Sequence, residues 1–225
     1  LNARLQRQGY DRHDVHRLAA RDRHVFAALM LEHGHGDGLV TGATRKSAHV
    51  MQRINMVFDA SAEHGAVGVT ALLHKGRIVL IGDTLVHEWP DEQDLATIAE
   101  RSADVARHLG LEPRVAFVSF STFGYPRSER AEKMHLAPSV LEQRGVDFEF
   151  EGEMTVDVAL NTTAQKAYPF SRLTGPANIL VVPARHSASI STKLMQEMAG
   201  ATVIGPILAG IDESIQICST VSTVN

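Results

Sequence analysis

The stretch Ile179-Leu-Val-Val-Pro-Ala-Arg-His-Ser-Ala-Ser-Ile-Ser-Thr-Lys-Leu-Met-Gln-Glu-Met-Ala-Gly200 predicts a buried strand, a serine-rich turn and a helix. Its apolar run stops at Pro183, and 193–199 is a strong helix former closed by Gly200. The turn carries three hydroxyls, those of Ser187, Ser189 and Ser191. At a helix N-terminus after a strand, free amides and the helix dipole favour a phosphate or carbonyl oxygen. A plain turn with one serine capping the helix explains the same residues.

Composition limits the class of protein. The chain has 225 residues, 44% of them hydrophobic and 21% charged, enough for one large α/β domain or two small ones. A net charge of -4 without a long run of Lys or Arg argues against a nucleic-acid partner. Cys218 is the single cysteine, which excludes an intrachain disulfide. With neither a leader nor an apolar run of roughly 18 residues, we expect a soluble, cytoplasmic protein without membrane contact. Because Leu1 opens directly into a polar helix and Asn225 follows a Ser/Thr segment without a stop signal, we also expect a fragment of a longer polypeptide.

Short strands alternate with helices in the second part of the chain, which predicts a mostly parallel sheet with sites at the carboxyl ends of its strands. The expected strands are 38–42, 67–73, 78–81, 115–119, 146–150 and 179–182, with one more between Gly200 and Gly210 and another after Gly210 that contains Cys218. Helices are expected to end near Gly34 and to cover 48–58, 91–109, 129–144, 156–166 and 193–199. The small, polar segment 59–65 is the candidate hinge.

Several side chains outside the opening stretch are candidates for chemistry. Ser121 and Thr122 follow the strand 115–119, so their hydroxyls are expected at the same rim of the sheet as the serine-rich turn, although ordinary turn chemistry also explains them. Glu153 and Asp157 would share one helix face if their segment were helical, either for acid/base work or as an acid pair favoured by the helix dipole. His33-Gly-His-Gly-Asp37 lacks the rigid scaffold and further ligands of a metal site.

One further segment, 83–90, leaves a strand and ends before an acid-rich helix start. Its Trp89-Pro90 pair predicts a packed cap rather than a site. Phosphate-loop, GxGxxG and GxSxG patterns are all missing from the sequence, which removes the usual support for ATP-dependent and classical dinucleotide chemistry.

Taken together, these segments resemble the phosphate acetyltransferase family, and most closely the acetyltransferase-like C-terminal domain of bacterial NADP-dependent malic enzymes. The His-Ser-Ala-Ser-Ile-Ser-Thr-Lys run ending at Lys193 is specific to the malic-enzyme branch. The matching positions cover nearly the whole chain in a consistent order and are 38–43, 83–86, 118–124, 148–160, 173–178, 186–193 and 205–210.

The resemblance implies two three-layer α/β subdomains with mostly parallel sheets, a cleft between them, and the second inserted into the first. The first would comprise 1–62 and 208–225, truncated at both ends, and the second 63–207. The resemblance also implies an acetyl-CoA or phosphate site. Its residues would be Arg53, Ser121, Thr122, Ser187, Ser189, Ser191, Lys193, Pro206 and Ser219.

Differences from the catalytic residues of the family decide whether this chain is expected to transfer an acetyl group. Family members that transfer an acetyl group between acetyl phosphate and CoA use arginines and a Ser-Arg pair followed by an Asp. Here Ser219 keeps the serine place, Thr220 takes the arginine place, and the Asp would fall beyond Asn225. Two further arginines of the family pattern are also replaced. One place holds Gln52, with Arg53 next to it as a possible substitute, and the other aligns with Leu5, which lies between Arg4 and Arg7. Loss of one such guanidinium removes about 3 kcal/mol of transition-state stabilisation.

The favoured hypothesis is therefore a regulatory domain without transferase activity that binds acetyl-CoA and supports a homo-oligomer of at least two subunits. The malic-enzyme catalytic part, which oxidatively decarboxylates malate to pyruvate, would lie in the same polypeptide and alone hold NADP and a divalent metal. This domain itself is expected to hold no cofactor and no metal. The alternatives are an active phosphate acetyltransferase and a structural assembly domain without a ligand. Thr220 separates the first two hypotheses.

Overall fold

A computed structural model describes residues 1–58 and 65–220, which divide into two compact units. Leu1–Ala66 and Gly210–Asn225 form the first, and Val67–Ala209 form the second, so the second unit interrupts the chain of the first. The sequence-based boundaries lie at 62/63 and 207/208. The candidate hinge at 59–65 falls almost wholly on 59–64, outside the described residues. Among the residues described, no helix has the length and apolar character needed to cross a membrane.

Helices and one pair of strands build the first unit. The helices are α1 (Asn2–Leu5), α2 (Arg12–Arg21), α3 (Arg23–Glu32) and α4 (Ser47–Val57), with a 3-10 turn η1 (Gln6–Gln8) after α1. Strands β1 (Leu39–Gly42) and β8 (Ile215–Cys218) pair in parallel although they come from opposite ends of the chain. Asp11 and Asp22 cap α2 and α3 by accepting hydrogen bonds from the first free amides of those helices.

Six strands form the sheet of the second unit, in the order β5-β4-β6-β3-β2-β7. Their bounds are β2 Val67–His74, β3 Arg77–Gly82, β4 Arg114–Val118, β5 Glu149–Met154, β6 Ile179–Val181 and β7 Thr202–Ala209. Strand β2 runs antiparallel to β3 and β7, whereas the β3–β6, β6–β4 and β4–β5 pairs are parallel. The predicted mostly parallel α/β fold is confirmed.

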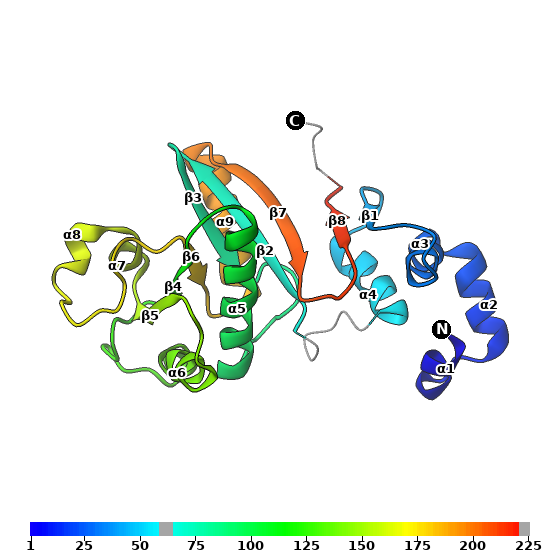
Figure 1. Ribbon diagram of the computed structural model, residues 1–225, viewed down its shortest axis with the longest axis horizontal. Coiled ribbons are helices and arrows are strands. Elements are labelled where there is room, and N and C mark those ends of the chain that lie inside the picture. Colours follow the sequence, from blue (N-terminus) through cyan, green and yellow to red (C-terminus); the bar gives the residue numbers. More distant parts are fainter. Residues whose placement is uncertain (59–64, 221–225) are drawn as a thin grey trace. The chain divides into compact units, whose positions relative to one another are not determined.

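Helices cover both faces of this sheet (Figure 1). Alternate residues of β4 show the two faces: Phe117 packs beneath α5 (Glu92–His108) and α6 (Glu129–Arg144), whereas Ala116 packs beneath α7 (Val156–Leu160) and α9 (Arg185–Ala199). A strand buried on both faces has no polar side to show, which explains why β4 and β6 read as unbroken apolar runs. The short helix α8 (Thr162–Gln165) follows α7.

Three expected elements differ in extent from the structure. The helix expected at 193–199 begins at Arg185, because Ala188 and Thr192 are buried against the sheet and extend the helix through serines of modest propensity. The helix expected at 156–166 is divided at Asn161, whose side chain accepts a hydrogen bond from Thr163 N and caps α8. The strand expected at 146–150 lies at Glu149–Met154.

Pro206 lies inside β7, at an irregular step in its pairing with β2. Gly205 before it has φ +131°, and a Cβ there would stand 2.8 Å from the carbonyl oxygen of Val69. Glycine is therefore required at this step, and a proline is tolerated in a sheet at such irregular or edge positions.

Candidate functional site

The carboxyl ends of β3, β4, β5 and β6 lie at one edge of the sheet of the second unit, because these strands run in the same direction. The segments that leave this edge begin at Asp83, Ser119, Thr155 and Val182. All of them carry residues that the sequence singled out. In a sheet of this kind the edge formed by the carboxyl ends is the usual position of a ligand.

Asp83 is a buried carboxylate that organises the segment after β3. Its Oδ1 accepts hydrogen bonds from the amides of Gly68 and Leu85, both at 2.8 Å. Its Oδ2 accepts from His87 N at 2.7 Å and lies 2.8 Å from His87 Nδ1. Since the side chain of His87 is only 2% exposed, this contact is shielded from water and fixes the course of the loop.

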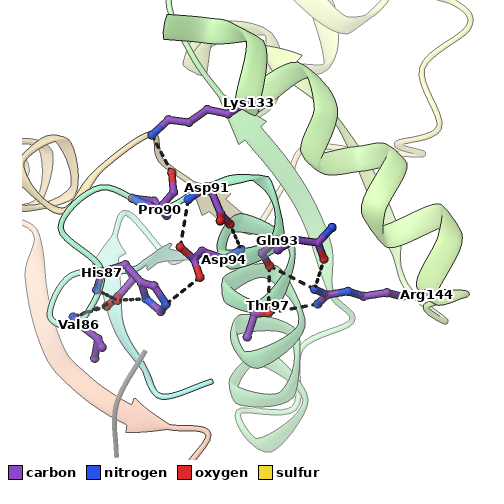
Figure 2. A network of polar contacts seen from close by, with 10 residues as sticks. Val86, His87, Pro90, Asp91, Gln93, Asp94, Thr97, Lys133 and Arg144 are labelled. Carbon is purple, nitrogen blue, oxygen red and sulfur yellow. Dashed lines mark hydrogen bonds and ion pairs between the residues drawn. The ribbon is translucent and has the colours of Figure 1, made fainter. Parts of the chain in front are cut away.

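The other side of the His87 ring faces the start of α5 (Figure 2). Its Nε2 lies 3.7 Å from Asp94 Oδ1 and has no hydrogen-bond partner among residues 1–58 and 65–220. Asp94 is held by a capping box with Asp91, in which each side chain accepts a hydrogen bond from the other's amide. Lys133 of α6 donates to the carbonyl of Pro90 at 2.7 Å and ties the end of the loop to that helix.

A hollow of about 520 Å³ opens beside this loop, entirely within the second unit. Its walls are Thr84, Glu88, Trp89, Arg185, His186 and Ser189. The expectation of a packed Trp89-Pro90 cap is wrong for the first residue: Pro90 is buried, whereas Trp89 is 70% exposed. Nothing in the local sequence distinguishes the two cases, because the partner ring of His186 stands almost a hundred residues further along the chain.

Only one hydroxyl of the serine-rich stretch faces that hollow. Ser187, Ser189 and Ser191 all lie inside α9, where a spacing of two residues cannot keep one face. Ser189 lines the hollow, whereas Ser191 donates its hydroxyl to the carbonyl of Ser187 in its own helix. Lys193, four residues beyond Ser189 in α9, is exposed. The helix thus begins two residues before Ser187, so the three serines lie in its first two turns and not in a turn that precedes it, and of the three Ser189 lines this hollow.

A second hollow, of about 590 Å³, lies between the loop after β4 and the first half of α6. At its base Glu153, 1% exposed, accepts hydrogen bonds from Gly124 N through Oε1 and from His135 Nδ1 through Oε2, both at 2.8 Å. Burial alone would raise the pKa of Glu153, but the hydrogen bonds from Gly124, the Ser121 hydroxyl and His135 outweigh it and lower that pKa below its usual range. The carboxylate is therefore ionised and orients an imidazole that is half exposed to the hollow.

The hydroxyls of the loop after β4 mostly form hydrogen bonds within the protein. Ser121 is 1% exposed and bonds to Glu153 and, at 3.5 Å, to Ser119. Thr122 Oγ1 accepts a hydrogen bond from Thr155 N at 3.2 Å and so joins the two segments that leave β4 and β5. Of the two predicted residues, Ser121 touches the second hollow and Thr122 does not line it.

The predicted face shared by Glu153 and Asp157 does not exist. Glu153 is the last residue but one of the buried strand β5, whereas Asp157 lies in the first turn of α7 and is exposed. Hydrogen bonding to Thr155 lowers the pKa of Asp157. Glu151, on the same strand, also has a distant partner and accepts from Arg172 N at 2.8 Å. Burial alone would lower the pKa of Arg172, but its hydrogen bonds to Glu151 raise it; no short-range spacing could reveal a contact across 21 residues.

Two predicted residues belong to the first unit. Arg53 Nε lies 3.0 Å from Asp22 Oδ2, with both side chains largely buried, so its charge is already paired with the residue that caps α3. Ser219 follows β8 and is half-buried, and Thr220 beside it is exposed.

His33 and His35 border an apolar hollow between α2 and α3. Within 1–58 and 65–220, no three His, Cys, Asp or Glu side chains are grouped to hold a metal ion.

The family model of the phosphate acetyl/butaryl transferases matches residues 1–225. This chain belongs to that family. The NADP-dependent malic enzyme of Rhizobium meliloti (strain 1021) is 50% identical over 97% of the chain, and the chain spans 29% of that enzyme's length. The phosphate acetyltransferase of Bacillus subtilis (strain 168) is 30% identical over 92% of the chain, which spans 65% of that protein.

Solved structures agree with the family assignment. A phosphotransacetylase from Streptococcus pyogenes has 25% sequence identity and a TM-score of 0.83, and the match covers 100% of this chain and 69% of that chain. The family thus has members in which the domain is most of the protein and members in which it is less than a third. The higher identity lies with the malic enzyme, so the chain corresponds to the phosphate acetyltransferase-like part of such an enzyme.

Proposed function

We propose that this chain is an acetyl-CoA-responsive regulatory domain of an NADP-dependent malic enzyme and that it lacks acetyl-transfer activity. The observation that carries the proposal is the state of two of the three arginine places in the transfer-active pattern. The place after Ser219 is filled by the neutral Thr220, and Arg53, the substitute next to the place held by Gln52, is paired with Asp22. A guanidinium already neutralised by a carboxylate contributes little to the developing charge of a transferring phosphoryl group.

Binding can persist without transfer, because recognition of a ligand needs fewer contacts than stabilisation of a transition state. The hollow beside Trp89, lined in addition by Arg185 and Ser189, supports a ligand site at the edge where the family resemblance places acetyl-CoA. The rest of the polypeptide would supply malate oxidation, NADP and a divalent metal. A coupling of about 1–3 kcal/mol between the two parts is enough for acetyl-CoA to regulate malate oxidation.

Assembly into at least a dimer is part of the proposal. Its support is a group of exposed apolar side chains on α9 and the neighbouring edge strand β7: Ile190, Leu194, Met198 and Ile204. Large apolar side chains gathered on one face are typical of surfaces that bind another protein. Sedimentation of the wild type and of Leu194→Glu at several concentrations tests this part, and a monomer at every concentration would contradict it.

Acetyl-CoA titrated into the protein by calorimetry, combined with an assay of acetyl phosphate formation from acetyl-CoA and phosphate, tests the function. The Bacillus subtilis relative serves as the positive control for turnover. We expect binding without turnover. Turnover near that of the control would establish the second candidate, an active phosphate acetyltransferase, which the 30% identity to that enzyme favours. Neither binding nor turnover would leave a structural assembly domain.

A further inference from the structure

Trp89 is the one tryptophan of the chain, and its position is unusual because 70% of its surface is exposed. Two residues close to it in the loop are held in place. His87 is buried and hydrogen-bonded to Asp83, and Pro90 is buried and accepts a hydrogen bond from Lys133. The indole is thus an exposed ring on a rigid loop rather than a side chain at a mobile tip. Rigid aromatic rings of this kind lose little entropy when a planar ligand stacks on them.

A second ring extends the surface of Trp89. The centroid of the His186 imidazole lies 4.9 Å from that of the indole, with 54° between the ring planes. His186 is exposed as well, and it projects from the first turn of α9. Two tilted rings at the mouth of one hollow leave open ring faces, on which a purine can stack as it does on aromatic side chains elsewhere.

The guanidinium of Arg185 lies beside the two rings, and two contacts restrict its position. Arg185 donates a hydrogen bond from Nη1 to the carbonyl of Leu85 at 3.1 Å, and its Nη2 lies 3.3 Å from Glu88 Oε2. Its side chain is 36% exposed. A guanidinium has five N–H donors, so two such contacts leave donors for a phosphate oxygen. The carboxylate of Glu88, 69% exposed, opposes a phosphate at the same place and limits its affinity.

We propose that this hollow binds a purine nucleotide, with the base on Trp89 and His186 and a phosphate on Arg185. This inference rests on the proposed function, because one end of acetyl-CoA is an adenine nucleotide and that end is the occupant we assign to the hollow. The volume of about 520 Å³ lies in the range of small-molecule sites, about 300–1,000 Å³. The acetyl end of the ligand then lies away from Trp89, so the contact recognises CoA and nucleotides without sensing the acyl group.

Calorimetry with two probes, adenosine 3′,5′-bisphosphate and acetyl-CoA, tests the proposal. Trp89→Ala and His186→Ala are each expected to weaken binding of both probes about 5- to 100-fold, the usual effect of removing a stacking ring. Trp89→Phe keeps a ring and should restore most of the affinity. Glu88→Gln should tighten binding, more so at low salt. Tyr125→Ala, which removes a ring that is 82% exposed but lies outside this hollow, is the matched control and should change nothing.

Fluorescence gives an independent readout, because a stacked base should quench the emission of Trp89, the sole tryptophan. Equal affinity of the wild type and Trp89→Ala for both probes would overturn the nucleotide site while leaving an acetyl-CoA-binding domain intact. Binding of the bisphosphate without binding of acetyl-CoA would retain the site for a free nucleotide and contradict the proposed function. Failure of both probes to bind the wild type would overturn both.

Discussion

Replacement of Glu153 by alanine is expected to destabilise the second unit by about 2–4 kcal/mol. The figure comes from the groups that the carboxylate satisfies. An amide such as that of Gly124, left without its acceptor, costs about 1–3 kcal/mol, and the Ser121 hydroxyl adds about 1 kcal/mol. The contact with His135 adds less than about 1 kcal/mol, because that side chain is 56% exposed and can turn to water.

Replacement by glutamine separates charge from shape. The amide oxygen of Glu153→Gln can still accept from Gly124, and its NH2 group can donate to the imidazole of His135 in the other tautomer. We therefore expect a smaller loss, about 1–2 kcal/mol. Urea denaturation followed by circular dichroism measures both variants. Glu197→Ala, which removes an exposed carboxylate from α9, is the control and should stay within about 0.5 kcal/mol of the wild type.

At acid pH the carboxylate of Glu153 should no longer stabilise the folded protein more than a glutamine does. Its pKa in the folded protein lies below the ordinary 4.5, so the unfolded chain takes up this proton first as the pH falls. The stabilisation is therefore complete above about pH 4.5 and is lost as the pH falls through the folded-state pKa. The difference in unfolding free energy between the wild type and Glu153→Gln should shrink from about pH 7 to about pH 3. A loss below about 1 kcal/mol for Glu153→Ala, or a difference that acid leaves unchanged, would refute the reasoning.

Three further substitutions follow from the same structure. Asp83→Asn places an amide donor among the amides that the carboxylate now accepts from, and should lower the unfolding free energy by about 2–4 kcal/mol in urea; a variant as stable as the wild type contradicts this. Gly205→Ala brings a Cβ to 2.8 Å from Val69 O and should lower the melting temperature by several degrees, whereas Gly110→Ala, also at positive φ but without neighbours within 4 Å, separates backbone strain from this clash. Arg172→Lys loses the planar contact with Glu151 and should destabilise by about 1–2 kcal/mol, less than Arg172→Ala; a lysine variant as stable as the wild type would show that guanidinium geometry is irrelevant.

Local patterns located the elements with strong signals. The unbroken apolar runs of β4 and β6 gave strands because both faces of the sheet are buried, and the capped, amphipathic α5 lies within one residue of its expected start. The predicted bounds of an element were wrong where tertiary packing overrides the helix propensity of the local sequence. Serines 187–191 extend α9 because the helix rests Ala188 on the sheet, so a turn expected from composition became two helical turns.

The sequence by itself determined the fold class, the family resemblance and the absence of an arginine at Thr220, since these depend on residue types in order along the chain. Tertiary structure alone decided what each polar side chain does. Arg53 is paired with Asp22, Glu153 holds His135, and Trp89 meets His186 across the mouth of a hollow. Such pairs join residues 18 to almost a hundred positions apart, and no periodicity or spacing encodes a distance that folding creates.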